Sequence, residues 1–420
     1  MKTSALLRAL LTVLFLLPAA AHAAGLALNP TSITPDHIGN VTLTITGVPN
    51  GATATVELFM DFDGDGTVAA NEPLIRRFTV TDGQVPTFGG IRNSNAPGDD
   101  DGTANGQMTV NVSYARTDQS DHFKGKFVWR VTSPTSAFSA VTAALTVTDR
   151  VHAQPINISG SVSGATYCVV LLIEATGQQR LLSGVMTDAS GNYSFTAPPG
   201  TYLLSAARCG TSGVTFVTDF TNPALISFPT GGTTNGLTLG TAATTRTITG
   251  RIVDDLGNGV GGAFIEANST NGLFALTYTD ANGDYTLSST SSEWEVEVAS
   301  WSLARNGFTA PHQDAMVLTT TGSVANVNFT APRVNALIYG MVTNESGAGV
   351  SNVVIEAEDS SFTYEAAGYS DAAGNYVLGV FGGTWFGGAD MEELAARGFV
   401  GLNFNGSPAT NAAVQRNVAL

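Results

Sequence analysis

The sequence predicts an all-β protein of 420 residues made of tandem β-sandwiches, and three observations support this prediction. A block of about 90 residues recurs three times, so a repeat organises most of the chain. Within each block, apolar and polar residues alternate over short segments that are separated by turn signals, as in half-buried strands. The chain also has 47 glycines and only 12% charged residues, a composition that disfavours coiled coils and helical bundles.

The first 23 residues are typical of a secretory signal peptide. A positively charged start precedes an apolar run over residues 9–21, and Ala21-His22-Ala23 is a small-x-small cleavage site. The run is too short to span a bilayer comfortably, and no later stretch is long and apolar enough for a transmembrane helix. We therefore expect a mature chain that starts at Ala24 and is secreted or held in the periplasm or at the cell surface.

Residues 24–154 lie outside the repeats and are predicted to form one Ig-like β-sandwich. Strand-like alternation is found at residues 42–45, 55–58, 109–112 and 145–147. A polar loop over residues 97–106 carries Asp99, Asp100 and Asp101. We expect it to be a solvated acidic loop, and the sequence leaves open whether it contributes to a second ion site.

The sharpest motif of the chain is the segment from Asp61 to Glu72, which matches the calcium loop D-x-D-x-D-G-x5-E. Asp61, Asp63 and Asp65 can converge their carboxylates, Thr67 can supply a carbonyl, and Glu72 can close the site bidentately. The flanking residues do not suit the helices of an EF-hand, because Pro73 follows at once. We therefore expect a structural calcium site between two strands, and the alternative is an acidic turn without metal.

The three repeats are predicted at residues 155–244, 245–334 and 335–420. Each begins with a strand that ends near a glycine and later contains an Asp-x-x-Gly-x-Tyr turn, in which Asp caps the turn and Gly supplies a positive φ. The glycines are Gly160, Gly250 and Gly340, and the turns begin at Asp188, Asp280 and Asp371. An aromatic residue follows each turn at a fixed distance, at Tyr202, Trp294 and Trp385. Short helical turns are expected at residues 390–398 and 302–307.

This pattern resembles the carboxypeptidase regulatory-like domain family. The resemblance covers residues 155–420 and implies a transthyretin-like, carbohydrate-binding-like sandwich, which in that family is an accessory domain. Its motifs mark turns and core residues, so it specifies the fold well and the function poorly. The expected architecture is thus one Ig-like domain followed by three transthyretin-like domains, arranged as a string that acts as a spacer and binding surface.

Two cysteines, Cys168 and Cys209, remain in the mature chain. In an oxidising compartment an even pair suggests a disulfide. The alternative is a pair of buried free thiols.

Catalysis is not indicated by any motif, and the chain is predicted not to be an enzyme. None of the five histidines is followed by Glu at the third position, and neither H-E-x-x-H nor Gly-x-Ser-x-Gly is present. Lys–Asn isopeptide crosslinks, known from the sandwich repeats of collagen adhesins, are ruled out because residues 155–420 contain no lysine. A formal net charge of −16 disfavours nucleic acid as a partner.

The leading functional prediction is an extracellular structural or adhesive module whose partner is a protein or a polysaccharide. Two alternatives remain open, namely a carbohydrate-binding protein and an accessory subunit of a secreted hydrolase. Trp294 and Trp385 occupy the framework position of the repeat, so we expect them in the core. Trp301 lies off that position and is the candidate for stacking on a sugar ring.

Overall fold

The computed structural model describes residues 23–114, 119–164, 166–175, 181–207, 216–219, 223–240, 242–401 and 403–420. Residues 1–22, which hold most of the predicted signal peptide, and Cys209 lie outside the described residues. The regular secondary structure of the described chain is almost entirely strand, and the strands pair into the two-sheet layers of successive sandwiches. The predicted all-β fold of tandem β-sandwiches is confirmed.

The N-terminal sandwich packs a three-stranded sheet against a five-stranded one. The first sheet has the order β1 (Gly25–Asn29), β3 (Gly39–Thr46), β8 (Gln107–Tyr114). The second has the order β2 (Ser32–Ile33), β10 (Val141–Val147), β9 (Gly125–Thr132), β4 (Thr53–Asp61), β5 (Leu74–Thr81). A short hairpin of β6 (Thr87–Phe88) and β7 (Ile91–Arg92) and the 3-10 helix η1 (Ser120–His122) lie outside these sheets.

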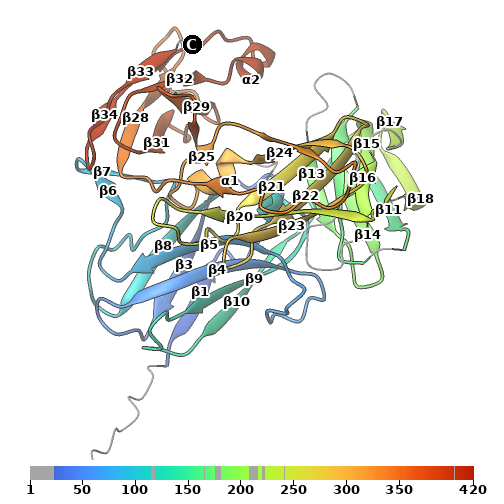
Figure 1. Cartoon of the computed structure of the whole chain (residues 1–420), viewed down its shortest axis with the longest axis horizontal. Coiled ribbons are helices and arrows are strands. Elements are labelled where there is room, and N and C mark those ends of the chain that lie inside the picture. Colours follow the sequence, from blue (N-terminus) through green and yellow to red (C-terminus); the bar gives the residue numbers. More distant parts are fainter. Residues whose placement is uncertain are drawn as a thin grey trace, which may run out of the picture.

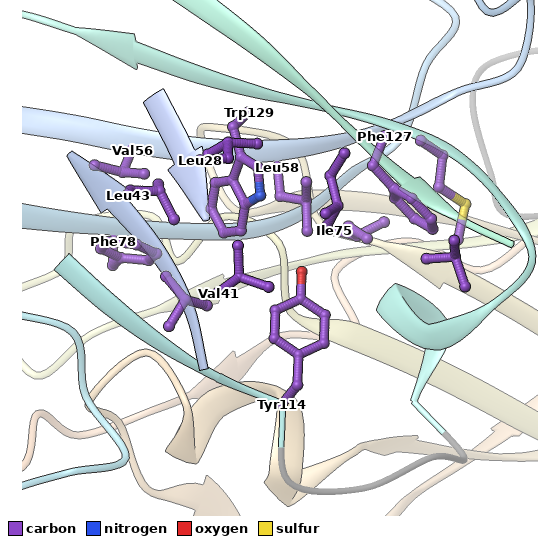
Figure 2. Packing of buried hydrophobic residues seen from close by; sticks show 14 of the residues in the cluster. Leu28, Val41, Leu43, Val56, Leu58, Ile75, Phe78, Tyr114, Phe127 and Trp129 are labelled. Atoms are coloured by element: carbon purple, nitrogen blue, oxygen red, sulfur yellow. The ribbon is translucent and has the colours of Figure 1, made fainter. Parts of the chain in front are cut away.

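The core of this sandwich comes from the alternate residues that each strand turns inward. Every second residue of β3 and β8 is buried, and together they face the inward residues of the other sheet. Figure 2 shows these side chains meeting between the sheets, with the hydroxyl of Tyr114 pointing into the cluster. The Trp129 side chain on β9 is completely buried there.

The three repeats share one arrangement of a small sheet and a larger sheet. In the first repeat the small sheet has the order β14 (Asn192–Ala197), β11 (Ile156–Val162), β18 (Gly232–Leu239), and the larger has the order β13 (Leu181–Met186), β12 (Val169–Glu174), β15 (Gly200–Ala207), β17 (Ala224–Phe228). In the second repeat the small sheet is β23 (Asp284–Ser289), β20 (Arg246–Val253), β27 (Phe329–Thr330). In the third it is β31 (Asn375–Val380), β28 (Ala336–Thr343), β34 (Ala413–Gln415), with β35 (Val418–Ala419) also paired to β28.

The larger sheets of the second and third repeats include strands from the repeat before. The second has the order β19 (Ala242–Ala243), β16 (Phe216–Asp219), β22 (Leu273–Tyr278), β21 (Phe264–Ser269), β24 (Glu293–Val298), β26 (Ala315–Leu318). The third has the order β25 (Ala310–Pro311), β30 (Tyr364–Tyr369), β29 (Val354–Asp359), β32 (Trp385–Ala389), β33 (Phe404–Gly406). Hence β16, β19 and β25 lie within one predicted repeat but complete the sheet of the next.

The helical segments are α1 (Ser300–Ala304) and α2 (Met391–Ala396). Both follow the last long strand of a larger sheet, β24 and β32. α2 lies where a helical turn was predicted. α1 overlaps the segment predicted at residues 302–307 but begins two residues earlier, at Ser300.

In each repeat, the motif glycine and the motif tyrosine contact the same backbone carbonyl group. A Cβ atom on Gly160 would lie 1.8 Å from the carbonyl oxygen of Leu237, so only glycine fits under that parallel strand. The Tyr193 hydroxyl of the same repeat donates to this oxygen at 3.1 Å. The corresponding hydroxyls of Tyr285 and Tyr376 donate to Val327 and Arg416 carbonyls, which likewise cover Gly250 and Gly340.

The framework aromatics are buried, as predicted. Trp294 and Trp385 have no exposed surface, and each indole NH donates to the carbonyl four residues earlier. The Tyr202 hydroxyl in the first repeat also donates to the carbonyl four residues earlier, at 3.0 Å. This shared bond explains why a polar-tipped aromatic recurs at the position.

The sandwiches do not form the expected string, because the repeats pack against the N-terminal sandwich (Figure 1). One hydrophobic cluster joins the N-terminal core to the first and second repeats, for example through Leu171 and Phe274. Lys124 exchanges two backbone hydrogen bonds with β13 of the first repeat. The side-chain amide of Asn95 donates to the Val377 carbonyl of the third repeat at 2.8 Å. The chain is therefore compacted by contacts that no local pattern announces.

Candidate metal centre

The predicted calcium loop joins two neighbouring strands of the N-terminal sandwich. Asp61 is the last residue of β4 and Leu74 is the first of β5, so the loop lies between strands as expected. Gly66 has a φ of 77°, a conformation that a residue with a side chain rarely adopts. The glycine at this position of the motif thus permits the sharp turn.

Three carboxylates of the loop converge. Asp61, Asp63 and Asp65 each offer an oxygen, and these oxygens lie within 4.8 Å of one another. The backbone NH groups of Gly64 and Gly66 donate to the two oxygens of Asp61, at 2.5 and 3.0 Å. These amides hold the Asp61 carboxylate at the centre of the turn, which is the arrangement needed for oxygen ligation.

Thr67 and Asp65 fix the exposed side of the loop. The backbone NH and the hydroxyl of Thr67 donate to one oxygen of Asp65, at 2.7 and 2.8 Å. These bonds lower the pKa of Asp65, so this carboxylate stays ionised. The Lys126 ammonium donates to the Gly64 carbonyl at 2.9 Å and places one positive charge beside the loop.

Glu72 is the residue of the loop whose bonding is incomplete. One of its oxygens accepts a hydrogen bond from the Ala69 amide at 2.8 Å, while Oε1 is buried without a hydrogen-bond partner. Burial, opposed by that amide and reinforced by the charges of the three aspartates, raises its pKa to about 7. A buried carboxylate oxygen without a donor is costly, and a hard cation bound by oxygen ligands would remove the cost.

The loop also borders a cleft between the N-terminal sandwich and the second repeat. The cleft has a volume of about 650 Å³, and Glu72 and Pro73 form part of its wall. Asp280 and Asp284, from the Asp turn of the second repeat, also line it. The last residue of the loop motif therefore lies at a cleft where two sandwiches meet.

The acidic loop at residues 99–101 agrees only in part with the expectation of a solvated loop, because Asp101 is exposed but Asp99 is not. Asp99 is completely buried, and its two oxygens accept the backbone NH groups of Gly83 and Thr109 at 2.7 and 2.9 Å. Asp100 forms an ion pair with Arg92 at 3.0 Å. These carboxylates fasten the loop to neighbouring segments, because each already has a partner within the chain.

Trp301 lies on α1, where its ring contacts other side chains of the fold. Its centroid is 5.5 Å from that of Phe264, and the Arg305 guanidinium lies 4.8 Å above its ring. Part of this indole is thus engaged in packing, and its predicted role in ligand binding stays a prediction. The predicted disulfide also stays a prediction, because Cys209 is outside the described residues.

Sequence reasoning did not single out a group of carboxyls around β24 and β25. Burial and a hydrogen bond with the carboxyl of Glu297 raise the pKa of Glu266 well above its usual value. Burial also raises the pKa of Glu365, whose Oε2 lies 3.5 Å from Nδ1 of His312. Only the alternation of charged residues on β24 could have signalled this group, since its members come from two repeats.

A buried ion network lies between the N-terminal sandwich and the second repeat. The Arg305 guanidinium donates to Asp121 at 2.7 Å and to the Ile75 carbonyl at 2.7 Å. Arg76, also completely buried, has its guanidinium 4.0 Å from the same Asp121 carboxylate and donates to the Arg305 carbonyl. Burial and the Arg305 charge lower the pKa of Arg76 to about 9.

Among the described residues, no helix has the length and apolar character needed to cross a membrane.

Comparisons with known proteins give no family. No family model and no curated protein match the chain. Among solved structures, the Bacillus anthracis TIE protein aligns over 94% of this chain and 74% of its own, with 10% identity and a TM-score of 0.21. A streptococcal ancillary pilin aligns over 63% of this chain and 99% of its own, with 10% identity and a TM-score of 0.21. BcpA, the major pilin subunit of Bacillus cereus, aligns over 63% and 98%, with 8% identity and a TM-score of 0.17. Similarities this weak do not assign a function to the chain.

Proposed function

We propose that the chain is an exported, non-catalytic protein that serves as an extracellular structural or adhesive module with a calcium-stabilised N-terminal domain. The observation that carries the calcium part is the cluster of three converging aspartate carboxylates. Glu72 is not part of that cluster, but the three charges raise its pKa and its buried Oε1 has no hydrogen-bond partner. Carboxylate oxygens without basic or thiol ligands suit calcium better than a transition metal. The motif over residues 61–72 and the incomplete bonding of Glu72, its last residue, support the same ion.

Calcium at this loop acts on stability. Without a cation, the four carboxylates of Asp61, Asp63, Asp65 and Glu72 repel one another and Glu72 is pushed towards its protonated form. With the ion bound, its binding free energy adds to the free energy of unfolding. At ten times the dissociation constant this gain is about 1.4 kcal/mol.

The test is the melting temperature of the full chain in EDTA and in millimolar calcium. We expect a rise with calcium that Asp63→Ala abolishes, whereas Asp101→Ala, an exposed aspartate in another loop, keeps it. Magnesium should raise the melting temperature less, because it demands a tighter octahedral shell. An unchanged melting temperature together with no calorimetric heat at millimolar calcium contradicts the proposed ion.

The extracellular part of the proposal rests on the signal-peptide pattern of residues 1–23. N-terminal sequencing of the protein from the native host should begin at Ala24, and protease added to intact cells should reach the protein. An unprocessed Met1 in the cytosolic fraction contradicts export and leaves the calcium test unaffected.

A further inference from the structure

A turn in the third repeat holds a phenylalanine in a conformation that phenylalanine disfavours. Phe362 lies between β29 and β30 and has a φ of 54°. The Asp359 carboxylate fixes this turn by accepting the backbone NH groups of Ser361, Thr363 and Tyr364, at 3.1, 2.8 and 2.8 Å. Bulky residues rarely adopt a positive φ, so such an outlier is a reason to look for a function.

In the second repeat, glycine occupies the equivalent position of this turn. Gly272 lies between β21 and β22, has a φ of 79°, and donates its NH to the Ser269 carbonyl as Phe362 donates to that of Asp359. Glycine adopts this conformation without strain. The backbone of the turn therefore does not require the phenylalanine of the third repeat.

The Phe362 ring does not contribute to the core either. It is 52% exposed and stacks on Phe386 of β32, which is 40% exposed. The centroids of the two rings are 6.3 Å apart and their planes differ by 16°. We call this pair the aromatic platform, because it presents two nearly parallel rings at the surface.

Polar groups lie beside the platform on the same sheet. Phe386 is directly opposite Glu358 on β29 and Asn405 on β33. Phe386 also lines a cavity of about 480 Å³, which Phe362 does not reach. The polar side chains around this cavity are two amides and three carboxyls, those of Asn403, Asn405, Glu356, Glu358 and Asp390. Carboxylate and amide side chains both accept hydrogen bonds, and the amides also donate them.

We propose that the aromatic platform and its polar neighbours bind a neutral polysaccharide, which deepens the adhesive role proposed above and rests on it. Pyranose rings have an apolar face that stacks on flat aromatic surfaces, and their hydroxyls pair with carboxylates and amides at the side. An acidic polymer would be repelled by Glu358 and by the net charge of −16. The exposed rings are too few for the apolar centre of a stable protein interface, so a sugar fits better than a folded partner.

The experiment is calorimetric titration of the full chain, in millimolar calcium, with cellohexaose, chitohexaose and maltohexaose. We expect at least one of these to bind, and Phe386→Ala to weaken it by about tenfold or more. Phe362→Gly should weaken binding similarly while leaving the melting temperature equal or higher, because glycine relieves the turn. Leu256→Ala, at an exposed apolar residue elsewhere, should leave the affinity unchanged.

Three results overturn the proposal. The first is the absence of binding by all three hexasaccharides while a heptalysine peptide binds, which would make the platform a cation site. The second is sugar binding that both phenylalanine variants leave intact. The third is no binding of any probe. In each case the calcium-dependent melting of the same samples reports separately on the proposed calcium-stabilised domain.

Discussion

The candidate metal loop of the N-terminal sandwich (residues 61–72) and the Asp turns of the repeats are both acidic turns. They differ in how many hydrogen bonds the chain donates to their carboxylates. In the repeats, one oxygen of the first aspartate accepts two backbone NH groups. Asp188 accepts those of Ser190 and Asn192, at 2.9 and 2.8 Å, and Asp280 accepts those of Asn282 and Asp284. Burial would raise the pKa of Asp188, but these bonds lower it below its usual value.

In the metal loop, the amides satisfy Asp61 but leave Glu72 incomplete. Its pKa is raised to about 7, in the direction opposite to that of Asp188. The difference between the two turns is the number of donors that the chain itself supplies to the carboxylates. We expect a cation to matter only where these donors are too few.

The Asp121 carboxylate has two buried cations of the chain itself as partners, Arg76 and Arg305. Asp121→Asn leaves the guanidiniums of Arg76 and Arg305 buried without their counter-ion. We expect a loss of about 3–5 kcal/mol in the free energy of unfolding, measured by urea denaturation, in EDTA as in calcium. Asp149→Asn, which breaks the partly exposed pair with Lys124, should cost less than about 1 kcal/mol. Equal losses would show that burial of the network contributes nothing.

Asp280 represents the turns that need no metal. Asp280→Ala removes the acceptor of two backbone NH groups and should lower the free energy of unfolding by about 1 kcal/mol. Calcium should still raise the melting temperature of this variant by the wild-type amount. Loss of the calcium response would place Asp280, which lines the neighbouring cleft, in the ion site. It would contradict the view that the Asp turns need no metal.

Lys126 places a positive charge beside the candidate metal loop. Its ammonium donates to the Gly64 carbonyl and lies close to the aspartates that would hold the ion. Lys126→Met removes this charge, so calcium affinity should rise about threefold, the size of a Coulomb repulsion screened by water. Isothermal titration calorimetry measures the affinity. An affinity that falls instead would mean that Lys126 shapes the loop for the ion.

The last prediction concerns two carboxyls that face each other, those of Glu266 and Glu297. Burial and Glu297 raise the folded-state pKa of Glu266, so folding takes up a proton. Its contribution to stability is full below the unfolded pKa of about 4.3 and is lost as pH rises through the raised folded value. Melting temperatures between pH 5 and 8 should therefore decline with pH, and more steeply in the wild type than in Glu297→Gln. Parallel curves would show that the pair does not share a proton.

The sequence predicted those features that depend on neighbouring residues. The Asp turns and the loop at residues 61–72 are set by short spacings, and their bonds run between residues two to five positions apart. The framework tryptophans were also predictable, because the same position recurs in each repeat. Periodic and local patterns therefore carried the fold class and the candidate ligands.

Features that depend on distant residues were not predictable. Asp99 was expected in solvent, but its partners Gly83 and Thr109 come from other parts of the sandwich. Arg305 meets Asp121 across 184 positions of the chain. No spacing in the sequence encodes such pairs, so the packing of the repeats around the first sandwich was missed. The positive φ of Phe362 was missed because the turn signal at that position is normally glycine.

The strands that one repeat lends to the next affect how the chain folds during synthesis. β16 emerges from the ribosome before β22, the strand with which it pairs, and β19 pairs with β16 at the edge of the same sheet. β25 likewise emerges before its partner β30. When β16 and β25 are synthesised, the strands with which they pair in the next repeat do not yet exist. They can therefore reach their final positions only when the next repeat folds. Residues 245–334 produced alone would lack two strands of their six-stranded sheet. We therefore expect neighbouring repeats to fold and melt together as one cooperative unit.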